Sequence, residues 1–201
     1  ESLPADASRP LELPKVGVGG TMNEEETRES LRRFLMASRE LIGADSAKLS
    51  LVERADQPDG TKLAIYEQRP FRYPIRGNYG KLQIRFTPDR RILNLSSTCI
   101  PQADRIQTSL AAVTPAVKVE EAVMKLRENG VMYTDANKNA SNLKIPAANE
   151  VNPRGLVTYI LPSKSRPDTL EFHIAWEIQI VNAPIKTVYV DAINGETLAV
   201  E

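Results

Sequence analysis

Histidine is almost absent from this sequence, which holds only one, His173, among 201 residues. A zinc peptidase centre needs two histidines one helical turn apart with a glutamate between them. A Ser-His-Asp triad would also have to use His173, and no G-x-S-x-G turn is present to carry its serine. The glycines at 17–20 lack the Gly-Lys pair of a phosphate-binding loop. We therefore expect no enzyme activity, no catalytic residue, no metal site and no cofactor.

Cysteine, net charge and long apolar runs are scarce as well. The only cysteine is Cys99, so no disulfide framework can form within the chain, and we expect a buried, unreactive thiol. The 26 Lys and Arg residues balance 26 Asp and Glu residues. This balance argues against a general binder of nucleic acid or membrane surfaces. No apolar run approaches the roughly 18 residues that cross a bilayer, so we expect no membrane span.

The N-terminal end of the sequence is Glu1 rather than a methionine. Such a start is typical of a processed chain. We therefore expect an exported protein, periplasmic, in the cell envelope or secreted, whose signal peptide has been removed. Three prolines and three glycines within residues 1–20 predict a flexible N-terminal segment.

What the sequence does contain is one succession of elements that occurs twice. Helices are expected at residues 21–42 and 118–129, because apolar residues recur there at helical spacing and a glycine follows each run. Alternation predicts strands at 48–54, 61–68, 79–86 and 91–96 in the first half, and at 156–161, 172–181, 185–190 and 197–200 in the second. Residues 108–117 are interpreted as a connector and 135–153 as a long loop.

This repetition predicts the fold class and the domains. A helix followed by an antiparallel meander is typical of a sheet curled around one helix. We therefore expect an α+β protein of two tandem modules, each a helix packed on a curved antiparallel sheet. The modules are predicted at residues 21–107 and 108–201.

The C-terminal strands resemble the end of a PepSY domain. Within 172–181, Ile174, Trp176 and Ile178 share the apolar face of one strand, and the segment VYVDA follows at 188–192. The Asn194-Gly195 pair is a strong hairpin signal before a short last strand. An Ala-Trp strand, a Val-Tyr-Val-Asp-Ala strand and a glycine turn, in this order, carry the resemblance.

An earlier stretch resembles the FTP motif of fungalysin and thermolysin propeptides. Gln68 stands where that motif has a glutamine-rich strand, and Pro74, Ile75 and Gly77 match its Pro-Val-x-Gly kink. A longer strand and a hairpin with Asp89 at its turn follow. Together the two resemblances imply the proregion of a thermolysin/fungalysin-type metallopeptidase, an FTP-like module followed by a PepSY-like module, without the peptidase domain.

The resemblance implies a regulatory function. In such families this region assists folding of the peptidase and restrains it. The chain is therefore interpreted as a non-catalytic exported module that acts by protein–protein docking, in peptidase inhibition or folding assistance. The alternative is a freestanding adaptor or ligand-binding module of the cell envelope. The expected partner is a protein, such as a thermolysin-like metallopeptidase, and not nucleic acid.

One stretch is a candidate docking surface. Residues 68–88 contain five basic residues and no acid, and three aromatic rings lie between Arg69 and Arg85. Arginine and aromatic side chains are enriched where proteins bind one another. The candidate partner-binding residues are Arg69, Phe71, Arg72, Tyr73, Arg76 and Tyr79. An ordinary sheet edge with solvated charges is the competing interpretation, and nucleic-acid binding is a poorer third because the rest of the chain is not basic.

Overall fold

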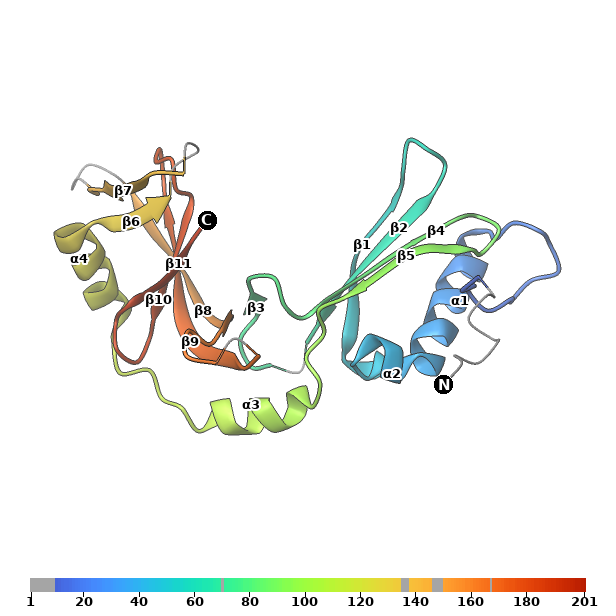
Figure 1. Ribbon diagram of the computed structural model, residues 1–201, viewed down its shortest axis with the longest axis horizontal. Coiled ribbons are helices and arrows are strands. Elements are labelled where there is room, and N and C mark those ends of the chain that lie inside the picture. Colours follow the sequence, from blue (N-terminus) through green and yellow to red (C-terminus); the bar gives the residue numbers. More distant parts are fainter. Residues whose placement is uncertain (1–9, 70, 135–137, 146–149, 167) are drawn as a thin grey trace, which may run out of the picture. The chain divides into compact units, whose positions relative to one another are not determined.

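The computed structural model describes residues 10–69, 71–134, 138–145, 150–166 and 168–201 (Figure 1). Contacts divide the chain into two compact units, residues 1–70 with 78–103 and residues 71–77 with 104–201. Each unit combines helix with antiparallel sheet, so the predicted α+β class is confirmed.

The first unit packs one long helix on a four-stranded antiparallel sheet. Helix α1 (Glu24–Ala37) begins at a capping box, in which the Asn23 side chain accepts from the Glu26 N–H and the Glu26 carboxylate accepts from the Asn23 N–H, both at 2.9 Å. The short helices α2 (Arg39–Ile42) and η1 (Ser46–Lys48) lead into the sheet. Its order is β1 (Leu49–Asp56), β2 (Lys62–Gln68), β4 (Lys81–Phe86) and β5 (Ile92–Ser97).

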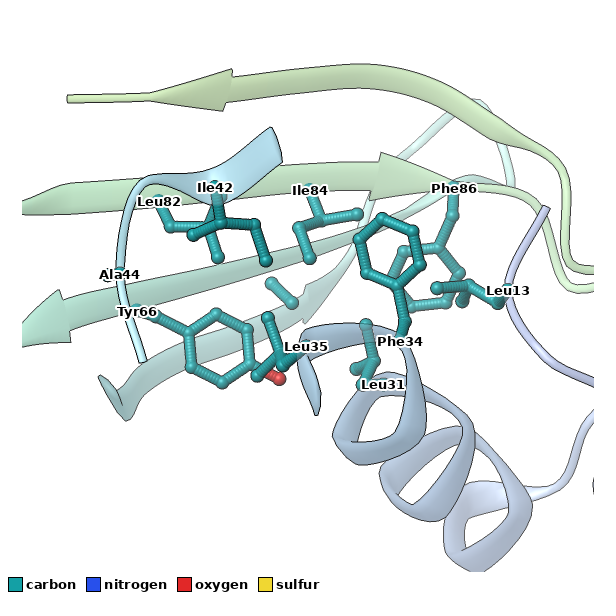
Figure 2. Close-up of a cluster of buried hydrophobic side chains, with 11 residues drawn as sticks. Leu13, Leu31, Phe34, Leu35, Ile42, Ala44, Tyr66, Leu82, Ile84 and Phe86 are labelled. Carbon is teal, nitrogen blue, oxygen red and sulfur yellow. The ribbon is translucent and has the colours of Figure 1, made fainter. Parts of the chain in front are cut away.

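The core of this unit lies between α1 and one face of the sheet (Figure 2). Strand β4 shows why, because its residues alternate strictly between exposed and buried and so give the helix one apolar face. Leu13, from the N-terminal segment, is also fully buried in this core. The buried side chains are Leu13, Leu31, Phe34, Leu35, Ile42, Ala44, Ala64, Tyr66, Leu82, Ile84 and Phe86.

The buried side-chain amide of Gln68 binds the backbone of Ile100, beyond the end of β5. The Gln68 side chain donates from Nε2 to the Ile100 carbonyl at 3.0 Å, and its Oε1 accepts from the Ile100 N–H at 2.8 Å. Gln68 is 4% exposed and Ile100 is 3% exposed. One side chain therefore satisfies both backbone groups of a buried residue that follows β5. Nearby, burial raises the pKa of the Cys99 thiol, in keeping with an unreactive cysteine.

The second unit is built on a five-stranded sheet. Its order is β11 (Thr197–Val200), β10 (Thr187–Asp191), β9 (Leu170–Ile180), β8 (Val151–Pro162) and β3 (Ile75–Arg76). All neighbours are antiparallel except β3, which runs parallel to β8. Helix α4 (Val119–Asn129) and the hairpin of β6 (Val131–Thr134) and β7 (Ala140–Leu143) complete the unit, and α3 (Ala103–Ala111) precedes them.

The sheet of the second unit buries apolar residues on both faces. On one face, Ala122 and Leu126 of α4 pack with Ile178, Val188 and their neighbours, and the half-buried Trp176 joins this cluster. The Trp176 indole N–H donates to the Val117 carbonyl at 2.9 Å. On the other face a smaller cluster contains Val157, Tyr159, Ala175 and Tyr189. The sequence predicts only the first of these clusters.

Several elements differ from the sequence-based expectation. Helix α3 occupies part of the predicted connector. Ala103, Ile106 and Leu110 recur in it at helical spacing, but the helix has only 9 residues and buries only Ala103. Strands β6 and β7 and the start of β8 were also not expected. Strand β7 and the first residues of β8 lie within the predicted loop at 135–153, of which residues 135–137 and 146–149 lie outside the described residues. Strand β8 accommodates Pro153 and Gly155 at a β-bulge, where a missing N–H and a weak strand former are tolerated.

Replacement of Gln68 tests the buried amide. In Gln68→Leu the Ile100 N–H and C=O would remain buried without partners, and each such group costs about 1–3 kcal/mol. We expect a clear fall in the urea midpoint of the first unit. Gln83→Leu is the matched control, because Gln83 is exposed on β4, and it should change stability by less than about 0.5 kcal/mol. Equal urea midpoints for the two variants would contradict the role of Gln68.

Candidate docking surface

Residues 71–77 are held on the sheet of the second unit. The Thr158 N–H donates to the Pro74 carbonyl at 2.9 Å, and the Thr158 hydroxyl donates to the Tyr73 carbonyl at 3.3 Å. Proline lacks an N–H, so it suits the edge of a sheet, where only its carbonyl has to be paired. Gly77, at φ +86°, then turns the chain away beside the Tyr159 ring. The segment is thus a short edge strand with a fixed position on β8.

An ion pair fixes the same segment from its side chain. The Arg76 Nε lies 2.8 Å from the Glu177 carboxylate on β9, and the two side chains are 36% and 13% exposed. Arg76 Nη1 also donates to the Ile75 carbonyl at 3.2 Å. A pair this sheltered is costly to break on one side, because the remaining charge stays partly buried. Arg76 therefore holds β3 in place, and its charge is already compensated.

Arg72 differs from Arg76 in its surroundings. Its guanidinium carbon lies 5.3 Å from the centroid of the Tyr73 ring, within the range of a cation–π contact. Its backbone N–H donates to Gln107 Oε1 at 2.8 Å. Arg72 is exposed, and within the described part of the chain it forms no ion pair. Its charge is therefore available to a partner.

The six predicted docking residues divide between the two units. Phe71, Arg72, Tyr73 and Arg76 belong to the second unit, where Phe71 stacks on Phe172 with ring centroids 6.4 Å apart. Arg69 and Tyr79 belong to the first, and Arg69 lies 4.0 Å from Glu67. The partner-binding role of all six stays a prediction. The four residues of the second unit lie on β3 or in the few residues that precede it.

Two tyrosines missed by the sequence analysis lie on the same face of the sheet as Glu177. The rings of Tyr159 and Tyr189 have centroids 4.4 Å apart, and the Tyr189 hydroxyl donates to Glu201 at 3.2 Å. Register places Tyr159 beside Arg76 and Tyr189 beside Glu177. Burial, and then the negative charge of Glu201, raise the pKa of both hydroxyls. Both tyrosines stand between β-branched residues, as is ordinary in strands, so no local signal marked them as site residues.

The single histidine lies on the same face, opposite Tyr159 in the register of β8 and β9. His173 Nδ1 lies 2.7 Å from Asp191 Oδ2, and the other Asp191 oxygen accepts from the Ile193 N–H at 2.7 Å and the Asn194 N–H at 3.3 Å. Asp191 is 4% exposed. The turn after β10 thus orients a carboxylate that holds the imidazole. Among the described residues, no cluster of three or more His, Cys, Asp and Glu side chains has the geometry of a metal site.

Removal of the imidazole tests this contact. We expect His173→Ala to lower the free energy of unfolding by about 1–3 kcal/mol, because the buried Asp191 carboxylate loses a hydrogen-bond partner. Glu171→Ala is the control, since that carboxylate lies 3.7 Å from the ring and is 46% exposed. It should leave the stability nearly unchanged, because exposed ion pairs contribute little. A His173→Ala variant as stable as the wild type would mean that the contact contributes nothing.

Because the pKa values of three tyrosines are raised, we expect the folded chain to lose stability at alkaline pH. Burial raises the pKa of Tyr66 to about 12, and the pKa values of Tyr159 and Tyr189 are raised for the same first cause. Since the folded state favours the neutral phenols, their contribution is complete below the ordinary tyrosine pKa of about 10 and is lost as the pH rises above it. Tyrosinate absorbance should therefore rise at higher pH in the folded chain than in denaturant. Coincident titration curves would contradict the burial of these hydroxyls.

Comparison with known proteins gives no family and a distant likeness to a solved structure. No protein-family model matches the chain, and no curated protein matches it. No helix in the described ranges has both the length and the apolar character needed to cross a membrane. Among solved structures, the C-terminal domain of YpeB from Bacillus megaterium matches with a TM-score of 0.36 and 12% sequence identity, over 94% of this chain and 68% of that one. The chain is thus similar to this domain distantly and in fold alone.

Proposed function

We propose that this chain is a non-catalytic, exported protein-docking module that acts on a thermolysin-like metallopeptidase, in inhibition or folding assistance. The observation that carries the proposal is the exposed Arg72, stacked on Tyr73 and without an ion-pair partner in the described part of the chain. The resemblance of the sequence to FTP and PepSY segments supplies the class of partner.

The geometry around Arg72 suits an acidic protein surface. A guanidinium group pairs with a carboxylate through two parallel hydrogen bonds, and Tyr73 adds contact area beside it. The backbone that carries both residues is fixed by β8 and by Gln107, so little order has to be gained on binding. Arg76 contributes by holding β3 to Glu177 rather than by contacting the partner.

The Nε2 atom of the single histidine is buried, so it is out of reach of a substrate, and this supports the non-catalytic part of the proposal. His173 is bound to a buried aspartate whose other oxygen is occupied by the backbone of a turn. This arrangement ties two strands together at the end of the sheet. In an adaptor of the cell envelope, the alternative function, the same surface would bind a different protein, and no peptidase would respond to it.

Binding to a peptidase tests the proposal directly. We expect the full chain to bind a purified thermolysin-like catalytic domain with a dissociation constant around micromolar, about −8 kcal/mol, and to slow its hydrolysis of casein or speed its refolding. Because exposed charges are screened by salt, the affinity should fall as ionic strength rises. Absence of both binding and any effect on peptidase activity or refolding would refute this function in favour of the adaptor.

A single charge reversal tests the residue. Arg72→Glu should weaken binding at least tenfold, or about 1.4 kcal/mol, while thermal unfolding stays unchanged. Lys186→Glu is the matched control, because Lys186 is exposed in the same unit and the net charge changes equally. Equal affinities for the two variants would show that Arg72 is not part of the docking surface.

A further inference from the structure

Strand β5 forms an open edge of the sheet in the first unit. The described residues pair with it only at its beginning, where the Ile92 N–H donates to the Leu11 carbonyl at 2.8 Å and Glu12 bridges to Arg91. Beyond this point, Leu93, Asn94, Ser96, Ser97 and Thr98 are exposed, and Leu95 is half-buried. Among the described residues, no strand pairs with this side of β5. The edge is therefore accessible along most of its length.

The backbone groups that face outward can be assigned from the ladder. The Thr98 N–H donates to the Lys81 carbonyl at 2.8 Å, so Thr98 faces β4. In an antiparallel strand alternate residues direct their N–H and C=O groups to opposite sides. Ser97 and Leu95 therefore direct theirs away from the sheet. Such groups are a template for pairing with another strand.

The two edge strands of this sheet differ in how well they are protected against pairing with a strand of another chain. Edge strands in monomeric proteins are commonly blocked by charges or bulges. Strand β1, at the opposite edge, carries Glu53, Arg54 and Asp56 and has an irregularity between Leu51 and Glu53. Strand β5 reads Ile-Leu-Asn-Leu-Ser-Ser and carries no charge. Its irregularity lies near its start, between Ile92 and Asn94, and leaves the following residues regular.

We infer that β5 is a self-association surface, on which a second copy of this chain adds its own β5 in antiparallel orientation. A two-fold axis places the same strand against itself. With the axis at Leu95, Asn94 of one copy lies opposite Ser96 of the other, and no like charges meet. The two four-stranded sheets then continue into one. A pairing this short buries less than the ~1,200 Å² of a stable interface, so the dimer is weak and concentration-dependent.

A matched pair of variants tests the register as well as the contact. Asn94 and Ser96 are both exposed and line an open hollow on the face of the sheet opposite α1, so charges there leave the core unchanged. Two double variants share the substitution Asn94→Asp. Within the chain, residue 94 lies opposite Arg85 on β4. Combined with Ser96→Lys it gives opposite charges across the two-fold axis, and combined with Ser96→Asp it gives like charges.

Sedimentation equilibrium of the full chain over a wide concentration range is the measurement. We expect the wild type and Asn94→Asp/Ser96→Lys to dimerise, and Asn94→Asp/Ser96→Asp to lose at least tenfold in dimer affinity. Ser109→Asp/Ala112→Asp adds the same charge at exposed positions of the second unit and should dimerise like the wild type. A wild type that stays monomeric, or two Asn94→Asp variants of equal affinity, would overturn the inference. Neither result bears on the docking role of Arg72.

Discussion

The pairing of β3 with β8 is the contact on which the candidate surface depends. Residues 71–77 stand in the sequence between the two parts of the first unit. Even so, carbonyls of this segment accept hydrogen bonds from Thr158, and Arg76 forms an ion pair with Glu177. Without these contacts the segment would be a linker of basic and aromatic residues. With them, Arg72 and Tyr73 have fixed positions beside a sheet. Because β3 is held in a fixed position, its neighbouring basic and aromatic residues form a surface that a partner can recognise.

Much of the fold follows from patterns that are local in the sequence. The apolar spacing along α1 and the alternation along β4 and β9 are signals within one element, and each predicted its helix or strand. Elements with short or interrupted patterns were not predicted. Helix α3 has 9 residues and buries only one of them, and β8 begins among turn-forming residues that a bulge accommodates. A short helix offers few apolar repeats and a bulge breaks the alternation of a strand, so periodicity does not separate either from a loop.

The candidate surface shows the same division. Composition alone picked out the arginines and rings at 69–79, but Glu177, which neutralises Arg76, lies 101 positions away along the chain. Asp59 likewise pairs with Arg85 from across the sheet. A basic run in a sequence therefore overstates the free charge, because its partners come from strands that only the fold brings near. Arg72 remains as the exposed charge, and the tyrosine pair beside Arg76 and Glu177 depends on strand register that no local pattern encodes.

Hydrogen–deuterium exchange of residues 71–77 tests the central claim most directly. If the segment is a strand on β8, the Arg76 amide should exchange slowly in the native chain, and Glu177→Gln should speed its exchange while the amides of α1 in the first unit keep their rates. If the Arg76 amide exchanges as fast as that of an unfolded peptide in the wild type, the segment is a linker. The account of a preformed docking surface would then be wrong.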